Sequence, residues 1–174
     1  MSTNRIVSIL LLMLLADCKP AEQREQLYLP ATLCTVVNGS RFEQNTEDVL
    51  SRGVNVVTPV WGDCHVCMDK FTRWDSLLCA EGLELNILFV VCTSYPDFFL
   101  STLYPDIPKN KCFRIVLDST GYFNGRNNLK LEDSHLNTFL VKNSTQIILR
   151  GNPLHDDRLM QQYKTLIRAH LSLR

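Results

Sequence analysis

Residues 54–78 read VNVVTPVWGDCHVCMDKFTRWDSLL, and this stretch decides the fold. Its beginning is rich in β-branched side chains, which is typical of a buried strand. Gly62 interrupts that strand, and a Cys-x-x-Cys pair follows at once, formed by Cys64 and Cys67. Apolar side chains then recur at helical spacing with charged ones between them, which predicts an amphipathic helix over 64–80. The sequence therefore predicts a strand, a tight turn, the cysteine pair and a helix, in that order.

This order places Cys64 at the open N-terminus of a helix and Cys67 one turn further in. Free backbone N–H groups and the positive end of the helix dipole favour a thiolate there, and the thiolate is the form that attacks a disulfide. Cys64 is therefore the expected nucleophile and Cys67 the expected resolving thiol, which closes the internal disulfide and releases a partner. A protonated His65 stabilises the Cys64 thiolate, whereas the charge of Asp63 opposes it.

The cysteine pair has two other interpretations, a structural disulfide or half of a metal site. A metal site needs a second ligand pair, and the sequence contains no other Cys-x-x-Cys and no His-x-x-x-His. Cys92 is expected to be a small core residue because it lies inside an apolar run. Three further cysteines are either core residues or partners in a second disulfide: Cys34, Cys79 and Cys112.

The 174 residues carry no formal net charge and are 45% hydrophobic, which suits one globular domain with a leader. The balanced charge gives no sign of nucleic-acid binding.

The leader is predicted over residues 1–18. Arg5 precedes an apolar run that is too short to span a bilayer comfortably, as in a signal peptide. The run ends in LLADC, which resembles the lipobox of bacterial lipoproteins, where a lipid is attached to the cysteine, here Cys18. Asp17 departs from that pattern because a small residue is usual there. The alternatives are an ordinary secreted protein or an uncleaved anchor.

Three segments follow from this interpretation: a lipoprotein-type signal peptide ending at Cys18, a tether and N-terminal extension over 19–40, and the main domain over 41–174. The expected location is the periplasm-facing side of a membrane in a bacterial cell envelope, with the lipid on Cys18 as the anchor.

Other elements are predicted along the rest of the chain. Strands are expected within 27–37, over 85–92 and over 112–117, helices over 46–52 with Thr46 as N-cap, over 96–104 and over 159–171, a loop over 124–135, and a hairpin of 138–141 with 146–150.

The order of these elements, a βαβ unit followed by ββα, resembles the thioredoxin fold. The chain is similar to thioredoxin-like proteins of the TlpA/ResA/DsbE group, and most of all to lipoprotein members found in Bacteroidetes. The matching segments are 60–67, 113–118, 137–141 and 147–153, which span about two-thirds of the chain. The resemblance implies an α/β fold with a central mixed sheet flanked by helices, and thiol–disulfide exchange at Cys64 and Cys67 outside the cytoplasm.

Two departures from the family bear on the site. Thioredoxins carry a cis-proline facing the cysteines, and Leu136 stands at that place here; a cis bond before a non-proline residue costs about 3 kcal/mol, so a trans bond is expected. The buried carboxylate of many thioredoxins has no match, because Thr58 lies in the corresponding strand. Next to Leu136, His135 is either a surface residue or a group that steers a proton. Trp61 either packs against its neighbours or shields the Cys64 sulfur.

The resemblance implies a membrane-tethered thiol–disulfide oxidoreductase that needs no diffusible cofactor and no metal. Its partners would be envelope proteins with thiols or disulfides, and an upstream dithiol protein would supply electrons. The family favours reduction, while His65 leaves the direction open. The rival interpretation is a non-catalytic binding or accessory lipoprotein in which the cysteine pair is a structural disulfide.

Overall fold

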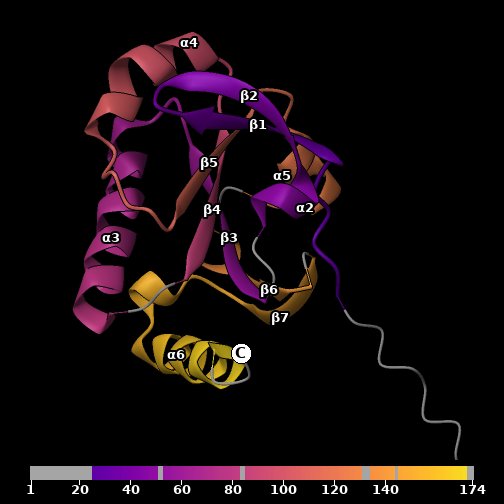
Figure 1. The fold of residues 1–174 in the computed structure, drawn as a ribbon, viewed down its shortest axis with the longest axis vertical. Helices are drawn as coiled ribbons and strands as arrows, with labels where there is room; N and C mark the ends of the chain where they lie inside the picture. The colour runs from indigo at the N-terminus through magenta and orange to yellow at the C-terminus, as the bar shows by residue number, and fades with distance from the viewer. Residues whose placement is uncertain (1–24, 51–52, 83–84, 131–133, 144, 172–174) are drawn as a thin grey trace, which may run out of the picture.

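A computed structural model describes residues 25–50, 53–82, 85–130, 134–143 and 145–171. The predicted signal peptide and Cys18 lie outside these residues. The described chain forms one seven-stranded mixed sheet in the order β2-β1-β5-β4-β3-β6-β7, with helices on both faces (Figure 1). The predicted α/β class with a central mixed sheet is confirmed. In the part of the chain that is described, no helix has the length and hydrophobicity to cross a membrane.

Three parallel strands form the centre of the sheet: β3 (Val54–Trp61), β4 (Asn86–Cys92) and β5 (Phe113–Asp118). Most of their side chains are apolar on both faces, as is typical of parallel strands between two helical layers. β4 lies in the middle of the three, and its residues 87–92 are all buried. The strand predicted from its apolar run is therefore confirmed.

The N-terminal hairpin consists of β1 (Thr32–Val37) and β2 (Ser40–Asn45). Its turn residues Asn38 and Gly39 both have positive φ, 51° and 79°, as a tight hairpin turn demands. β1 also pairs antiparallel with β5, so the N-terminal extension contributes to the main sheet, and the boundary predicted between residues 40 and 41 falls inside this hairpin. β2 was not predicted because all of its residues are exposed, which removes the alternating apolar pattern.

The short helix α2 (Thr46–Val49) corrects one detail of the prediction. Thr46 is its first helical residue, and Asn45 occupies the N-cap position without a side-chain cap. The Thr46 hydroxyl instead donates to the carbonyls of Pro30 and Ala31, which ties the helix to the chain before β1. Thr46 is therefore not the N-cap.

One core lies between the sheet and the helices α3 (Asp69–Glu81) and α6 (Asp157–Leu171). Its largest buried side chains include Phe71 and Trp74 of α3, Phe89 of β4 and Tyr163 of α6. The Phe71 and Phe89 ring centroids are 4.2 Å apart. Burial of these apolar faces holds both helices on the sheet.

A second core lies on the opposite face, under α2 and α5 (Tyr122–Arg126) (Figure 1). The segment 124–135 was predicted as a loop, but its first residues belong to α5, which ends at Arg126. The Asp118 carboxylate accepts the backbone N–H groups of Tyr122 and Phe123, which satisfies donors at the start of a helix too short to show periodicity.

The remaining elements include the predicted helical segment after β4 and the predicted hairpin, together with short 3₁₀ turns that were not predicted. The helical segment after β4 comprises α4 (Pro96–Phe98), η2 (Phe99–Leu103) and η3 (Tyr104–Asp106), and the C-terminal part contains η4 (Ser134–Leu136), β6 (Phe139–Lys142), β7 (Gln146–Arg150) and η5 (Pro153–His155) before α6.

Candidate active site

The turn after β3 brings the cysteine pair to the carboxyl edge of the parallel strands. Gly62 makes this turn: its N–H donates to the Cys92 carbonyl at 2.9 Å. A Cβ on Gly62 would lie 2.5 Å from Val91 Cγ1, so glycine alone fits against β4. The N–H of Cys64 then donates to the Trp61 carbonyl at 3.3 Å, which turns the chain into the helical segment.

Cys64 and Cys67 are joined by a disulfide with a Cα–Cα distance of 5.3 Å. Cys64 occupies the N-cap position of η1 (His65–Met68), a 3₁₀ turn that leads directly into α3. Both cysteines are half-buried, and Cys67 packs against the core under α3. The structure therefore places Cys64 at the open end of a helical segment, as the sequence predicted, although the first turn is 3₁₀ rather than α.

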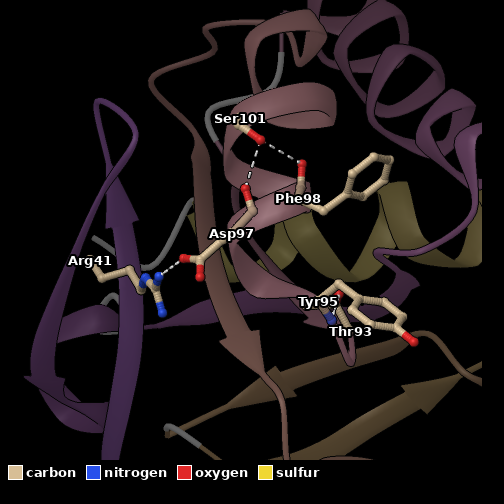
Figure 2. A network of polar contacts seen from close by, with 6 residues as sticks. All are labelled: Arg41, Thr93, Tyr95, Asp97, Phe98 and Ser101. Atoms are coloured by element: carbon tan, nitrogen blue, oxygen red, sulfur yellow. Dashed lines mark hydrogen bonds and ion pairs between the residues drawn. The ribbon is translucent and has the colours of Figure 1, made fainter.

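Asp63 is held by the loop that follows β4. Its carboxylate accepts the Thr93 hydroxyl and, at 3.1 Å, the backbone N–H of Ser94. The Thr93 hydroxyl accepts in turn the N–H of Tyr95 at 3.0 Å, a contact that Figure 2 shows. His65, the other predicted neighbour of Cys64, is exposed to solvent.

Exposed apolar side chains are found near this loop. Tyr95 is 66% exposed and Phe98 of α4 is 49% exposed, and both protrude from the loop and helix after β4 in Figure 2. Val66, between the two cysteines in sequence, is 82% exposed. An ion pair between Arg41 of β2 and Asp97 links the same helix to the N-terminal hairpin (Figure 2). Val66 thus gives the segment between the two cysteines an exposed apolar side chain.

A cavity of about 270 Å³ opens beside the disulfide. Its wall includes Trp61 of β3, Cys67 of η1, Lys70 and Arg73 of α3, and Asn137 just before β6. Trp61 is 36% exposed, belongs to neither hydrophobic core and contributes to this wall.

Lys70 lies in the wall of this cavity, although the sequence analysis did not select it as a site residue. Its Nζ donates to the Pro59 carbonyl at 2.9 Å and to Thr58 Oγ1 at 3.3 Å. Burial lowers the pKa of Lys70 to about 8, and the nearby Cys92 opposes this shift. Sequence reasoning assigned Lys70 to the polar helix face; its spacing of three residues after Cys67 was the signal that it shares the side of that cysteine.

The predicted pair His135 and Leu136 lies in and around η4. Within the described residues no peptide bond is cis, so the bond before Leu136 is trans as expected. Both side chains are exposed, and neither belongs to the wall of the cavity beside Cys67. Their backbone carbonyls are used instead: that of His135 accepts the N–H of Asn152 at 2.7 Å, and that of Leu136 accepts Nε of Arg150 at 3.1 Å.

The other described cysteines are free. Cys92 is buried in β4 as predicted, and burial together with the charge of Asp118 raises its pKa to about 12. The second disulfide considered for the remaining three is not formed among them: Cys34, Cys79 and Cys112. Over the described ranges, no group of three or more His, Cys, Asp or Glu side chains is placed to hold a metal ion.

Comparison with solved structures identifies the architecture. A protein from Chlorobium tepidum assigned as the thiol:disulfide interchange protein DsbE superposes with a TM-score of 0.59 at 12% identity, covering 84% of this chain and 98% of that one. Yeast Sco1, also solved with copper bound, superposes with a TM-score of 0.54 at 16% identity over 84% and 97% of the two chains.

The exposed lipoprotein thioredoxin Etrx1 from Streptococcus pneumoniae superposes with a TM-score of 0.51 at 15% identity, covering 78% of this chain and 96% of that one. No family model and no curated protein matches the sequence. At these identities the similarity establishes the fold. The chain has a thioredoxin-like fold, with the Cys64–Cys67 disulfide at the N-terminal end of the helical segment that follows β3.

Proposed function

We propose that this protein is a thiol–disulfide oxidoreductase in which Cys64 is the nucleophile and Cys67 the resolving thiol. The observation that carries the proposal is the Cys64–Cys67 disulfide, half-buried at the start of a helical segment and next to an open cavity. A disulfide in this position is reached by a partner thiol, and the free N–H groups of the first turn stabilise the thiolate that forms on reduction.

The reaction transfers two electrons from the reduced Cys64–Cys67 dithiol to a partner disulfide. The Cys64 thiolate attacks a partner disulfide, a mixed disulfide forms, and one partner sulfur leaves as a thiolate. Cys67 then attacks Cys64 Sγ, the internal disulfide forms, and the second partner sulfur leaves. The partner is reduced and the Cys64–Cys67 pair is oxidised, so an upstream dithiol protein must return two electrons. No diffusible cofactor takes part.

The proposal places this chemistry in the bacterial cell envelope. The LLADC sequence ending at Cys18 supports lipid attachment and a membrane tether. One solved neighbour of the same fold is itself an exposed lipoprotein. The substrates would be envelope proteins with disulfides, reduced at the exposed surface around Val66 and Tyr95.

The test is the reduction potential of the Cys64–Cys67 pair in the full chain, measured by equilibration in thiol buffers followed by alkylation. We expect a reversible couple between about −270 and −120 mV, the range of exchange proteins, abolished by Cys64→Ser and unchanged by Cys79→Ser as the matched control. Reduction only after unfolding, or a potential below about −300 mV, would identify a structural disulfide and overturn the proposal.

A further inference from the structure

The helical segment presents Lys70 on the same side as Cys67. The two are three residues apart, close to one helical turn, and both lie in the wall of the 270 Å³ cavity. Lys70 Nζ donates to the Pro59 carbonyl and to Thr58 Oγ1, which both belong to β3. The amine therefore lies between α3 and β3, on the inner side of the cysteine pair.

A chain of buried hydroxyl groups continues from Lys70 to the segment before β6. Thr58 Oγ1 is 2.8 Å from Thr138 Oγ1, and both threonines are fully buried. No carboxylate takes part in this chain, so the Lys70 ammonium has only neutral hydrogen-bond partners in it. Burial disfavours the ammonium form and lowers the pKa of Lys70 to about 8, against the opposing effect of Cys92.

Other charged and titratable side chains lie around the Lys70 amine. Asp69 and Arg73 of α3 and His155 of η5 line the same cavity, and Cys92 of β4 acts on Lys70 through the sheet. Arg73 is occupied, because it donates to the Leu154 carbonyl and contacts the His155 ring. Lys70 instead donates to the Pro59 carbonyl and the Thr58 hydroxyl under α3.

The cavity also holds an unsatisfied acceptor. Asn137 is 7% exposed, its amide N–H donates to the Lys130 carbonyl at 2.8 Å, and its Oδ1 has no hydrogen-bond partner. Buried oxygens of this kind are normally satisfied by a donor, and a polar cavity of this size admits water.

We propose that Lys70 is the group that accepts the proton of the Cys67 thiol when the mixed disulfide is resolved, in place of the buried carboxylate that the strand lacks at Thr58. This rests on the proposed function and concerns its second step only. At pH 7 about a tenth of an amine with a pKa near 8 is neutral, so a proton acceptor is present at working pH.

The step balances. In the mixed disulfide, Cys67 passes its proton to the neutral Lys70 amine, directly or through water in the cavity, and becomes a thiolate. The thiolate attacks Cys64 Sγ, a Cys64–Cys67 bond forms, and the bond between Cys64 and the partner sulfur breaks. The partner sulfur leaves with the electron pair, and the proton returns from the Lys70 ammonium to it or to solvent.

The two steps are separable with an aromatic disulfide reagent that releases one coloured thiolate per attack. Added to the reduced full chain carrying Cys79→Ser, it reports the Cys64 attack first and the Cys67 resolution second. Cys67→Ser identifies the second release. We expect Lys70→Met to slow that release about tenfold or more at pH 7 and to remove an inflection near pH 8 from its pH profile.

Two further variants separate proton transfer from charge. Lys70→Arg keeps the positive charge and loses the exchangeable neutral form, so it should also slow resolution and lack the inflection. Lys109→Met, an exposed lysine over the Tyr104 ring, is the matched control and should leave both releases unchanged. An unaltered second release in both Lys70 variants would overturn the proposal while leaving the proposed function intact. Absence of any Cys64-dependent release would instead refute the proposed function.

A measurement on the unmutated side chain covers the case in which the Lys70 variants do not fold. The Lys70 Nζ is titrated by ¹⁵N NMR in the oxidised and in the reduced full chain. Proton exchange with Cys67 requires the two groups to titrate as a coupled pair, so the pKa of Lys70 should change on reduction. An identical titration in both redox states would contradict the proposal.

Discussion

The carboxylate of Asp63 accepts the backbone N–H of Ser94 at 3.1 Å, which ties the turn before Cys64 to the loop after β4. The same carboxylate accepts the Thr93 hydroxyl. A negative charge beside Cys64 disfavours its thiolate, while the hydrogen bonds fix the turn that presents it. The charge of Asp63 therefore disfavours the Cys64 thiolate, whereas its hydrogen bonds hold the turn that presents Cys64. Substitutions of Asp63 can separate these two effects.

We expect Asp63→Asn to lower the pKa of Cys64 in the reduced protein, because the amide retains an acceptor for Ser94 and loses the charge. The measurement is the pH dependence of Cys64 alkylation. Asp63→Ala, which also removes the hydrogen bonds, should in addition reduce the free energy of unfolding by about 1–3 kcal/mol. An alkylation profile unaffected by Asp63→Asn would mean that the carboxylate has no electrostatic effect on the thiol.

A second prediction concerns the close approach of the turn to β4. Gly62→Ala would place a Cβ 2.5 Å from Val91 Cγ1 and 2.9 Å from Thr93 Cβ, both in a packed region. Overpacking of this kind costs about 1–3 kcal/mol. We therefore expect Gly62→Ala to lower the free energy of unfolding, measured in urea, by this amount. We also expect it to displace the cysteine pair. Gly125→Ala in α5 is the control: nothing lies within 4 Å of its Cβ, so stability should be unchanged or slightly higher.

The sequence was sufficient for the centre of the fold and for the cysteine pair. Long apolar runs such as 85–92 lie between two helical layers, and this environment leaves an unambiguous pattern. The parts that were missed, β2 and α5, depend on pairing and capping instead. β2 is exposed along its whole length, and α5 starts where the Asp118 carboxylate accepts backbone N–H groups.

The candidate site was also predictable only in part. Cys64 and Cys67 follow from local spacing, whereas Lys70 and Asn137 join the site only through contacts with residues far away in the sequence. Lys70 reaches back to Thr58, and Thr58 contacts Thr138 eighty residues later. Helical periodicity places Lys70 on a polar face, and it contains no information on which strand lies under that face. His135 and Leu136 were selected by alignment and lie outside the cavity wall.

Thiol labelling tests the placement of the free cysteines. In the oxidised native protein, Cys79 is exposed and should react with iodoacetamide readily. Cys92 is buried with a pKa raised to about 12, so it should remain unmodified until the protein unfolds. Mass spectrometry of peptides after brief labelling at pH 8, with and without urea, distinguishes the two. Equal labelling of Cys92 and Cys79 without urea would show that β4 is not the buried central strand.

The final prediction is the pH dependence of stability that Lys70 imposes on the oxidised protein. The pKa of Lys70 is lowered from 10.5 to about 8 by burial, so between these values the folded amine is neutral while the unfolded one still binds a proton. Stability therefore rises with pH in this window, because the unfolded state holds more protons. Below pH 8 both states are charged, and the folded state carries the cost of a buried ammonium.

Burial also raises the pKa values of Cys92 and Tyr163, which makes stability fall at high pH. These two groups are present in wild type and in Lys70→Met alike, so the difference between the two proteins isolates Lys70. From pH 8 to pH 10 the free energy of unfolding of the wild type should increase by about 2 kcal/mol relative to Lys70→Met, measured by urea denaturation. A constant difference across this range would show that burial does not lower the pKa of Lys70, and the proposed proton acceptor for Cys67 would then be charged at working pH.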